Sequence, residues 1–190
     1  MGIKTVAVIG AGTMGAGIAQ VCAQAGWKTN LYDAFPEGLE KGMATIDNFW
    51  DKGIARGKTT TEQKTEWSAN LHAFTEMKEA VKNVDLVIEA VPEIPELKHK
   101  IFSDLGNMTK ADCILGTNTS SLSIADIAAA SGRPEKVIGM HFFNPVPIMK
   151  LLELVKHDSC SEDTIQAATA AGEAMGKTTI LVKDVPGFAT

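Results

Sequence analysis

Of the four histidines in the chain, His141 is the best placed for chemistry. It ends an apolar stretch over residues 136–143 that is typical of a buried strand, just before a turn signal that contains Asn144. Because an imidazole titrates near neutral pH, a histidine at this position could remove a proton from a substrate alcohol. His99 and His157 are expected to face solvent, the first on a polar helix face and the second in a charged loop.

Glu153 interrupts the apolar segment LLELV and could assist this histidine. Burying a carboxylate between leucines costs free energy unless a partner compensates its charge. Two interpretations stay open. In one, Glu153 lies on a strand edge that faces water; in the other, it fixes the tautomer of His141 and stabilises the imidazolium, as the acid does in a serine-protease triad.

A second group of polar side chains, the segment TNTSS over residues 117–121, follows another predicted strand. Its hydroxyls could simply cap the next helix, because serine and threonine are preferred at helix N-termini. Alternatively, one serine caps the helix while another points into a site at the end of the strand.

A glycine motif near the N-terminus predicts a phosphate-binding turn. It has the pattern G-x-G-x-x-G, lies between a predicted strand and a predicted helix, and consists of Gly10, Ala11, Gly12, Thr13, Met14 and Gly15. Asp33 ends the next predicted strand, where it would accept hydrogen bonds from ribose hydroxyls and repel a 2′-phosphate. The pattern therefore favours NAD over NADP. The alternatives are a flavodoxin-like turn that binds nothing, or an FAD site.

The elements that must position these residues alternate between strands and helices. Strands are predicted over 3–9, 28–33, 84–91, 112–118, 136–143, 150–156 and 178–183, and helices up to Gly26, over 37–53, from Glu62, and over 94–108, 121–131 and 161–176. This order predicts an α/β fold with a Rossmann-like, doubly wound, mostly parallel sheet and a helical excursion after the second strand. Ligands bind at the carboxyl ends of such strands, so we expect His141 and the dinucleotide at the same edge.

Composition limits the classes of function. The chain has 190 residues, 45% of them hydrophobic, and a net charge of −5, which predicts a globular protein that binds neither nucleic acid nor a membrane surface. No apolar run approaches the ~18 residues of a membrane span. Cys22, Cys113 and Cys160 show no zinc-ligand spacing, which predicts no metal site and a reducing, cytoplasmic location.

Five segments together resemble the 3-hydroxyacyl-CoA dehydrogenase family, especially the bacterial 3-hydroxybutyryl-CoA dehydrogenases. They are VAVIGAGTMGAGIAQ, DLVIEAVPE, TNTSSLSI, GMHFFNPVPIMKLLELV and DVPGFAT. The resemblance implies NAD-dependent oxidation of (S)-3-hydroxyacyl-CoA to 3-oxoacyl-CoA, or the reverse reduction of acetoacetyl-CoA. It also implies a place in fatty acid β-oxidation or butanoate metabolism.

Matching positions imply a role for each catalytic residue. His141 corresponds to the catalytic base and Glu153 to its partner. Ser120 corresponds to the serine that contacts both the substrate hydroxyl oxygen and the cofactor, and Asn144 to the asparagine near the nicotinamide.

Further residues are implied in binding. Glu93 and Lys98 correspond to residues that line the nicotinamide half of the NAD site. Arg56, with Lys58 close by, corresponds to a basic residue of the helical excursion that meets the coenzyme A moiety.

The same resemblance implies a domain division. Residues 1–184 would form the NAD-binding Rossmann domain, and residues 185–190 would start the connection to an all-helical C-terminal domain that is absent from this chain and forms a homodimer. The 190-residue chain alone is then expected to bind NAD with little turnover. The alternatives are a non-catalytic NAD-binding module and a different Rossmann β-hydroxyacid dehydrogenase.

Overall fold

A computed structural model of the chain describes residues 2–185 and contains one eight-stranded sheet. The strands are β1 (Thr5–Ile9), β2 (Lys28–Tyr32), β3 (Leu71–Phe74), β4 (Leu86–Glu89), β5 (Ile114–Thr117), β6 (Val137–Phe142), β7 (Leu151–Lys156) and β8 (Thr178–Lys183). Their order across the sheet is β3-β2-β1-β4-β5-β6-β7-β8. Every neighbouring pair is parallel except β6 and β7, which are antiparallel.

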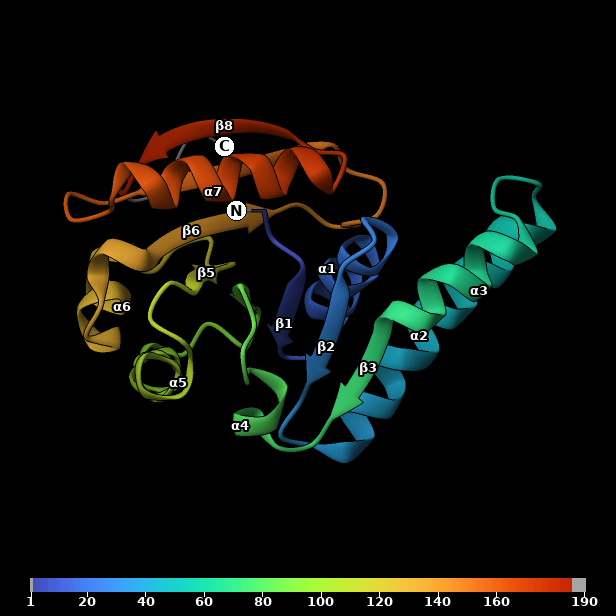
Figure 1. Ribbon diagram of the computed structural model, residues 1–190, viewed down its shortest axis with the longest axis horizontal. Coiled ribbons are helices and arrows are strands. Elements are labelled where there is room, and N and C mark those ends of the chain that lie inside the picture. The colour runs from blue at the N-terminus through green and yellow to red at the C-terminus, as the bar shows by residue number, and fades with distance from the viewer. Residues whose placement is uncertain (1, 186–190) are drawn as a thin grey trace.

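Helices cover both faces of this sheet (Figure 1). They are α1 (Thr13–Gln24), α2 (Pro36–Ala55), α3 (Thr61–Asn70), α4 (Met77–Ala80), α5 (Pro95–Met108), α6 (Ile124–Ser131) and α7 (Glu162–Ala174), with a 3₁₀ turn η1 (Pro134–Lys136). Side chains of α1, α2 and α7 pack in one buried cluster, and those of α5 and α6 in a second cluster on the opposite face. The predicted Rossmann-like fold is confirmed.

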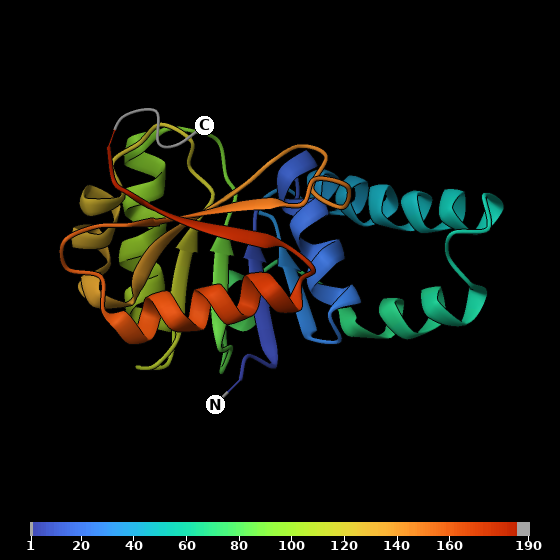
Figure 2. The ribbon, with the colours of Figure 1, turned by 90° about the horizontal axis from the view of Figure 1, so that it is seen from above.

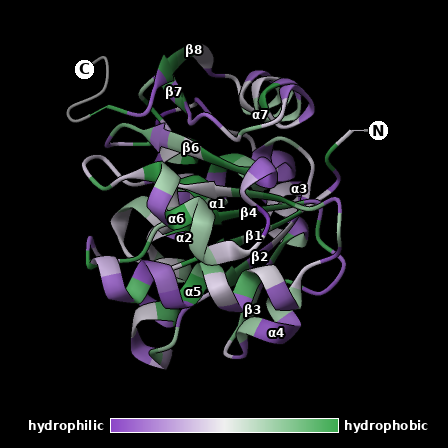
Figure 3. Ribbon diagram, turned by 90° about the vertical axis from the view of Figure 1, so that its left-hand side faces the viewer, coloured by the Kyte–Doolittle hydropathy of each residue, from purple (hydrophilic) through white to green (hydrophobic). Residues whose placement is uncertain are grey.

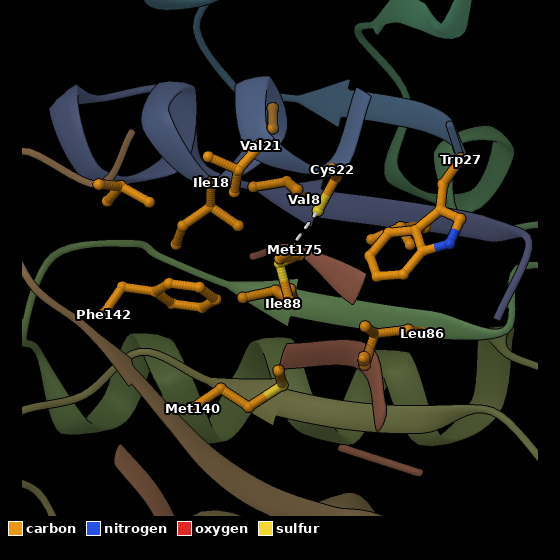
Figure 4. Packing of buried hydrophobic residues seen from close by; sticks show 14 of the residues in the cluster. Val8, Ile18, Val21, Cys22, Trp27, Leu86, Ile88, Met140, Phe142 and Met175 are labelled. Carbon is orange, nitrogen blue, oxygen red and sulfur yellow. Dashed lines mark hydrogen bonds between the residues drawn. The ribbon is translucent and has the colours of Figure 1, made fainter. Parts of the chain in front are cut away.

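The central strands are buried on both sides, which explains their unbroken apolar sequences. In β1, Val6 and Val8 belong to one cluster, whereas Ala7 and Ile9 belong to the other. Hydrophobic residues accordingly concentrate on the strands in the middle of the molecule, and hydrophilic ones on the outer helices (Figure 3). Figure 4 shows the first cluster, in which Met175, the residue after α7, contacts Cys22 of α1.

The helices α2 and α3 form a hairpin that projects beyond the β3 edge of the sheet (Figure 2). A capping box between Thr60 and Gln63 fixes the start of α3. The rings of Trp50 and Trp67 hold the two helices together, with centroids 5.8 Å apart. This hairpin is the predicted helical excursion.

Besides the 3₁₀ turn η1, the structure adds two short elements that the sequence did not predict. They are the edge strand β3 and the single-turn helix α4, each four residues long. The sequence LHAF of β3 carries no apolar run, and its two middle residues are exposed. Its strand conformation depends on parallel pairing with β2, from Thr29 opposite Leu71 to Tyr32 opposite Phe74. Among residues 2–185, no helix combines the length and apolar composition of a transmembrane span.

Candidate functional site

A cavity of about 1200 Å³ lies where β1, β2, β4, β5 and β6 end. Because these strands are parallel, the residues that follow them meet beyond the carboxyl ends of the strands, on one side of the sheet. The glycine turn, Asp33, Glu93, Ser120, His141 and Asn144 all line the cavity. The structure therefore brings the predicted imidazole and the predicted phosphate-binding turn to the same edge.

Two glycines of the turn have different roles: Gly12 leaves room for a ligand, and Gly15 stands where no side chain would fit. A Cβ on Gly15 would collide with the carbonyl oxygen of Gly10, so the helix and strand can pack this closely only with glycine there. A Cβ on Gly12 would meet no atom within 4 Å. Gly12 is also the N-cap of α1 and supplies no side chain to the helix end, so backbone N–H groups and the helix dipole remain available to phosphate oxygens.

Asp33 is held in place by the backbone around it. Its Oδ2 accepts a hydrogen bond from Ala11 N at 2.8 Å, and its Oδ1 accepts one from Phe35 N at 2.9 Å. An ionised carboxylate has about four acceptor sites, so these two bonds leave capacity for ribose hydroxyls. The negative charge disfavours a 2′-phosphate at the same place.

His141 and Glu153 form a pair across the antiparallel strands β6 and β7. They lie directly opposite each other in the register, and His141 Nδ1 is 2.7 Å from Glu153 Oε1. The Glu153 side chain is completely buried, with an exposed fraction of 0%. The interpretation that placed Glu153 at a water-facing edge is therefore wrong, because β8 continues the sheet beyond β7. The ring of Phe143 packs against the imidazole, with centroids 4.6 Å apart.

The segment after β5 is attached to Glu93. Glu93 Oε2 accepts hydrogen bonds from Thr119 Oγ1 at 2.7 Å, from Ser120 N at 3.3 Å and from Ser121 Oγ at 3.0 Å. Partial burial opposes the charged form of Glu93, but hydrogen bonds from Lys98, Thr119 and Ser121 outweigh it and hold the pKa of this carboxyl below its ordinary value.

Helix capping is the task of a different serine. Ser123 is the N-cap of α6, and its hydroxyl accepts a hydrogen bond from Asp126 N at 3.2 Å. Ser120 is exposed and lines the cavity. The serine that caps α6 therefore lies outside the segment 117–121, and within that segment Ser120 lines the cavity.

Residues 5–185 match the model of the family described as 3-hydroxyacyl-CoA dehydrogenase, NAD binding domain. The chain belongs to this family. NAD is accordingly its cofactor, and the open space at Gly12, the N-terminus of α1 and the acceptor capacity of Asp33 fit the diphosphate and the ribose.

Individual relatives agree with this assignment. The chain is 42% identical over 188 residues to a probable 3-hydroxybutyryl-CoA dehydrogenase of Bacillus subtilis, covering 99% of this chain and 65% of that protein. It is 40% identical over 186 residues to a fatty acid oxidation complex subunit alpha of Idiomarina loihiensis, covering 98% of this chain and 26% of the relative. The chain thus spans slightly less than two thirds of the shorter of these relatives.

Solved structures show the same fold. The crystal structure of (S)-3-hydroxybutyryl-CoA dehydrogenase from Ralstonia eutropha matches with a TM-score of 0.96 at 40% identity, covering 99% of this chain and 66% of that one. The structure of 3-hydroxybutyryl-CoA dehydrogenase from Escherichia coli matches with a TM-score of 0.95 at 38% identity, covering 98% of this chain and 39% of that one.

Besides the buried Glu153, three of the residues implied by the resemblance lie away from the cavity lining. Lys98 is buried, with an exposed fraction of 1%, and its ammonium contacts the carboxylates of Glu89 and Glu93. Arg56 and Lys58 lie where α2 ends, in the connection at the far tip of the α2–α3 hairpin (Figure 2).

Two features of the structure differ from or go beyond the sequence prediction. His157 was expected in solvent but is only 8% exposed, because its ring hydrogen-bonds to Val137 O at 2.9 Å and to Ser159 N. Glu89, which is not among the predicted site residues, is completely buried at the end of β4. The sequence did contain a signal for this site. Glu89 lies inside the apolar run VDLVIEAV, and a carboxylate there, like that of Glu153, needs a partner to compensate its charge when it is buried.

Replacing Gly12 by valine tests the phosphate site. We expect NADH affinity to fall at least about tenfold, or about 1.4 kcal/mol, because the new side chain occupies the space that a diphosphate must enter. Fluorescence titration with NADH measures this effect, and thermal unfolding should change little. Gly2→Val is the matched control, since a Cβ on Gly2 also meets no atom within 4 Å. Unchanged affinity in the Gly12 variant would mean that the diphosphate binds elsewhere.

Proposed function

We propose that the protein, at the length of its relatives, catalyses NAD-dependent oxidation of (S)-3-hydroxyacyl-CoA to 3-oxoacyl-CoA and the reverse reduction of substrates such as acetoacetyl-CoA. The observation that carries the proposal is that His141, paired with the buried Glu153, lines the same cavity as the glycine turn. A base beside a bound nicotinamide can remove the hydroxyl proton of an alcohol while its carbon loses a hydride.

Each side chain then has a definite task. Bound NAD supplies the acceptor for the hydride that leaves C3 of the substrate. His141 takes the hydroxyl proton on Nε2, because Nδ1 is held by Glu153 at 2.7 Å. Glu153 fixes the ring orientation and compensates the positive charge that the imidazole gains. Ser120 and Asn144 line the cavity. There Ser120 would donate a hydrogen bond to the reacting oxygen, and Asn144 would contact the nicotinamide of bound NAD.

The acyl-CoA substrate is proposed to extend from this cavity toward the α2–α3 hairpin. Arg56 and Lys58 at the hairpin tip offer cationic groups to the coenzyme A phosphates. The fatty acid oxidation relative supports a place in the metabolism of fatty acyl chains.

The domain division and the setting of the protein are part of the same proposal. Residues 1–184 form the NAD-binding domain, and residues 185–190 begin the connection to a helical domain through which the protein forms a homodimer. Of this connection, residues 186–190 lie outside the described residues. Cys22, Cys113 and Cys160 form no disulfide with one another, which is compatible with the cytoplasm as the proposed location.

The proposal can be tested by adding acetoacetyl-CoA and NADH and measuring the oxidation of NADH by the loss of its absorbance. The full-length protein should consume NADH only when the CoA thioester is added. A protein that binds NADH but oxidises none would be a non-catalytic binding module. Turnover with free β-hydroxyacids but not with CoA thioesters would identify a different β-hydroxyacid dehydrogenase.

A further inference from the structure

A buried glutamate that the proposed mechanism does not use lies beside the cavity. Glu89 is the last residue of β4, and its side chain has an exposed fraction of 0%. Its Oε1 accepts a hydrogen bond from the Thr117 hydroxyl at 2.6 Å, and its Oε2 accepts from Val91 N at 2.7 Å and from the Lys98 ammonium at 2.7 Å. Since Thr117 is the register partner of Glu89, this carboxylate connects the ends of β4 and β5 to α5.

Lys98 continues the connection to the cavity wall. Its Nζ is also 2.9 Å from Oε1 of Glu93, the half-exposed carboxylate that lines the cavity. The other oxygen of Glu93 binds the segment 119–121, including the backbone N–H of Ser120. A continuous series of two ion pairs and one hydrogen bond therefore leads from Glu89 through Lys98 and Glu93 to the backbone of Ser120.

We infer that Glu89 is a positioning residue for Ser120 and acts through Lys98 and Glu93; this inference rests on the proposed role of Ser120 at the reacting oxygen. The Lys98 ammonium lies between two carboxylates and is attracted by both. When Glu89 is neutral, Lys98 is drawn to Glu93 alone. Glu93 then shifts, and the serine segment that it holds shifts with it.

The Glu89→Gln variant of the full-length protein tests this coupling in a double-mutant cycle with Ser120→Ala. We expect Glu89→Gln to lower kcat about tenfold to a hundredfold, because small misplacements of a catalytic group are costly, and to leave the Kd for NADH within about twofold. In a Ser120→Ala background, the same change should lower kcat by less than about twofold, because nothing remains to be positioned. A loss of equal size in both backgrounds would overturn the inference.

Asp85→Asn provides the matched control. Asp85 directly precedes β4 at the opposite end of the strand, where it forms an ion pair with Lys110 at 2.6 Å and accepts hydrogen bonds from two backbone N–H groups. This acid-to-amide change should affect stability but not kcat. If Glu89→Gln fails to fold, Thr117→Val can take its place, because it removes one hydrogen bond to Glu89. We expect Thr117→Val to lower kcat several-fold, and we expect this loss to disappear in the Ser120→Ala background.

Hydrogen exchange separates this inference from the proposed function. Amide exchange over residues 118–122 should be faster in Glu89→Gln than in the wild type and in Asp85→Asn. If the wild type reduces no acetoacetyl-CoA, the proposed function fails, and faster exchange still supports the connection from Glu89 to the serine segment. Unchanged exchange would overturn the inference whether or not the protein is active.

Discussion

His141→Gln lowers the kcat of the full-length protein for acetoacetyl-CoA reduction by about 10²- to 10⁴-fold, the usual contribution of a positioned acid or base. Glutamine has nearly the same reach as histidine but cannot exchange a proton near neutral pH. NADH affinity should change little, because the glycine turn and Asp33 bind the distant part of the cofactor. Steady-state kinetics and NADH titration measure the two effects separately.

His157→Gln is the control for this prediction. It replaces a buried imidazole in the same domain, but His157 is absent from the residues that line the large cavity. We expect lower stability and a kcat within about twofold of wild type. Near-normal turnover by His141→Gln would remove His141 from the role of the base.

Glu153→Gln should lower kcat by a comparable factor, about 10²- to 10⁴-fold, by analogy with the acid of a serine-protease triad. The amide keeps the size of the carboxylate but cannot compensate an imidazolium, and its NH₂ group can donate to Nδ1 and favour the wrong tautomer of His141. Because the amide keeps the size of the buried carboxylate and can still hydrogen-bond to His141, the free energy of unfolding should fall only a little.

Kinetics and thermal unfolding of Glu153→Gln together decide its role. Glu173→Gln, on the exposed side of α7, makes the same chemical change away from the cavity and should alter neither property. A Glu153→Gln protein that unfolds readily but retains its kcat when folded would show that the carboxylate supports only the fold.

Local features of the site follow from short stretches of sequence. The glycine turn and Asp33 are both predictable because the strand, turn, helix and second strand that form this site are consecutive, and each has its own periodicity or breaker residues. For Glu153 the apolar neighbours left two interpretations open, a strand edge that faces water and a partner for His141, and they could not decide between the two.

Partnerships between distant segments were decided by the tertiary structure. The antiparallel pairing of β6 and β7 puts His141 opposite Glu153, and a register shifted by one residue would have turned one of them to the other face. The Glu89–Lys98 ion pair forms because α5 packs back over the end of β4. His157 is buried because its ring reaches the backbone of β6.

The amino-acid sequence alone determined where most of the strands and helices form, which turn can approach a phosphate, and which side chains have the right chemistry. The tertiary structure alone decided which charges meet, which polar groups are sealed from water, and that residues 71–74 join the sheet. The physical reason is the range of the forces involved. Backbone preferences and hydrophobic periodicity act over a few residues, whereas burial and charge pairing depend on segments that only folding brings together.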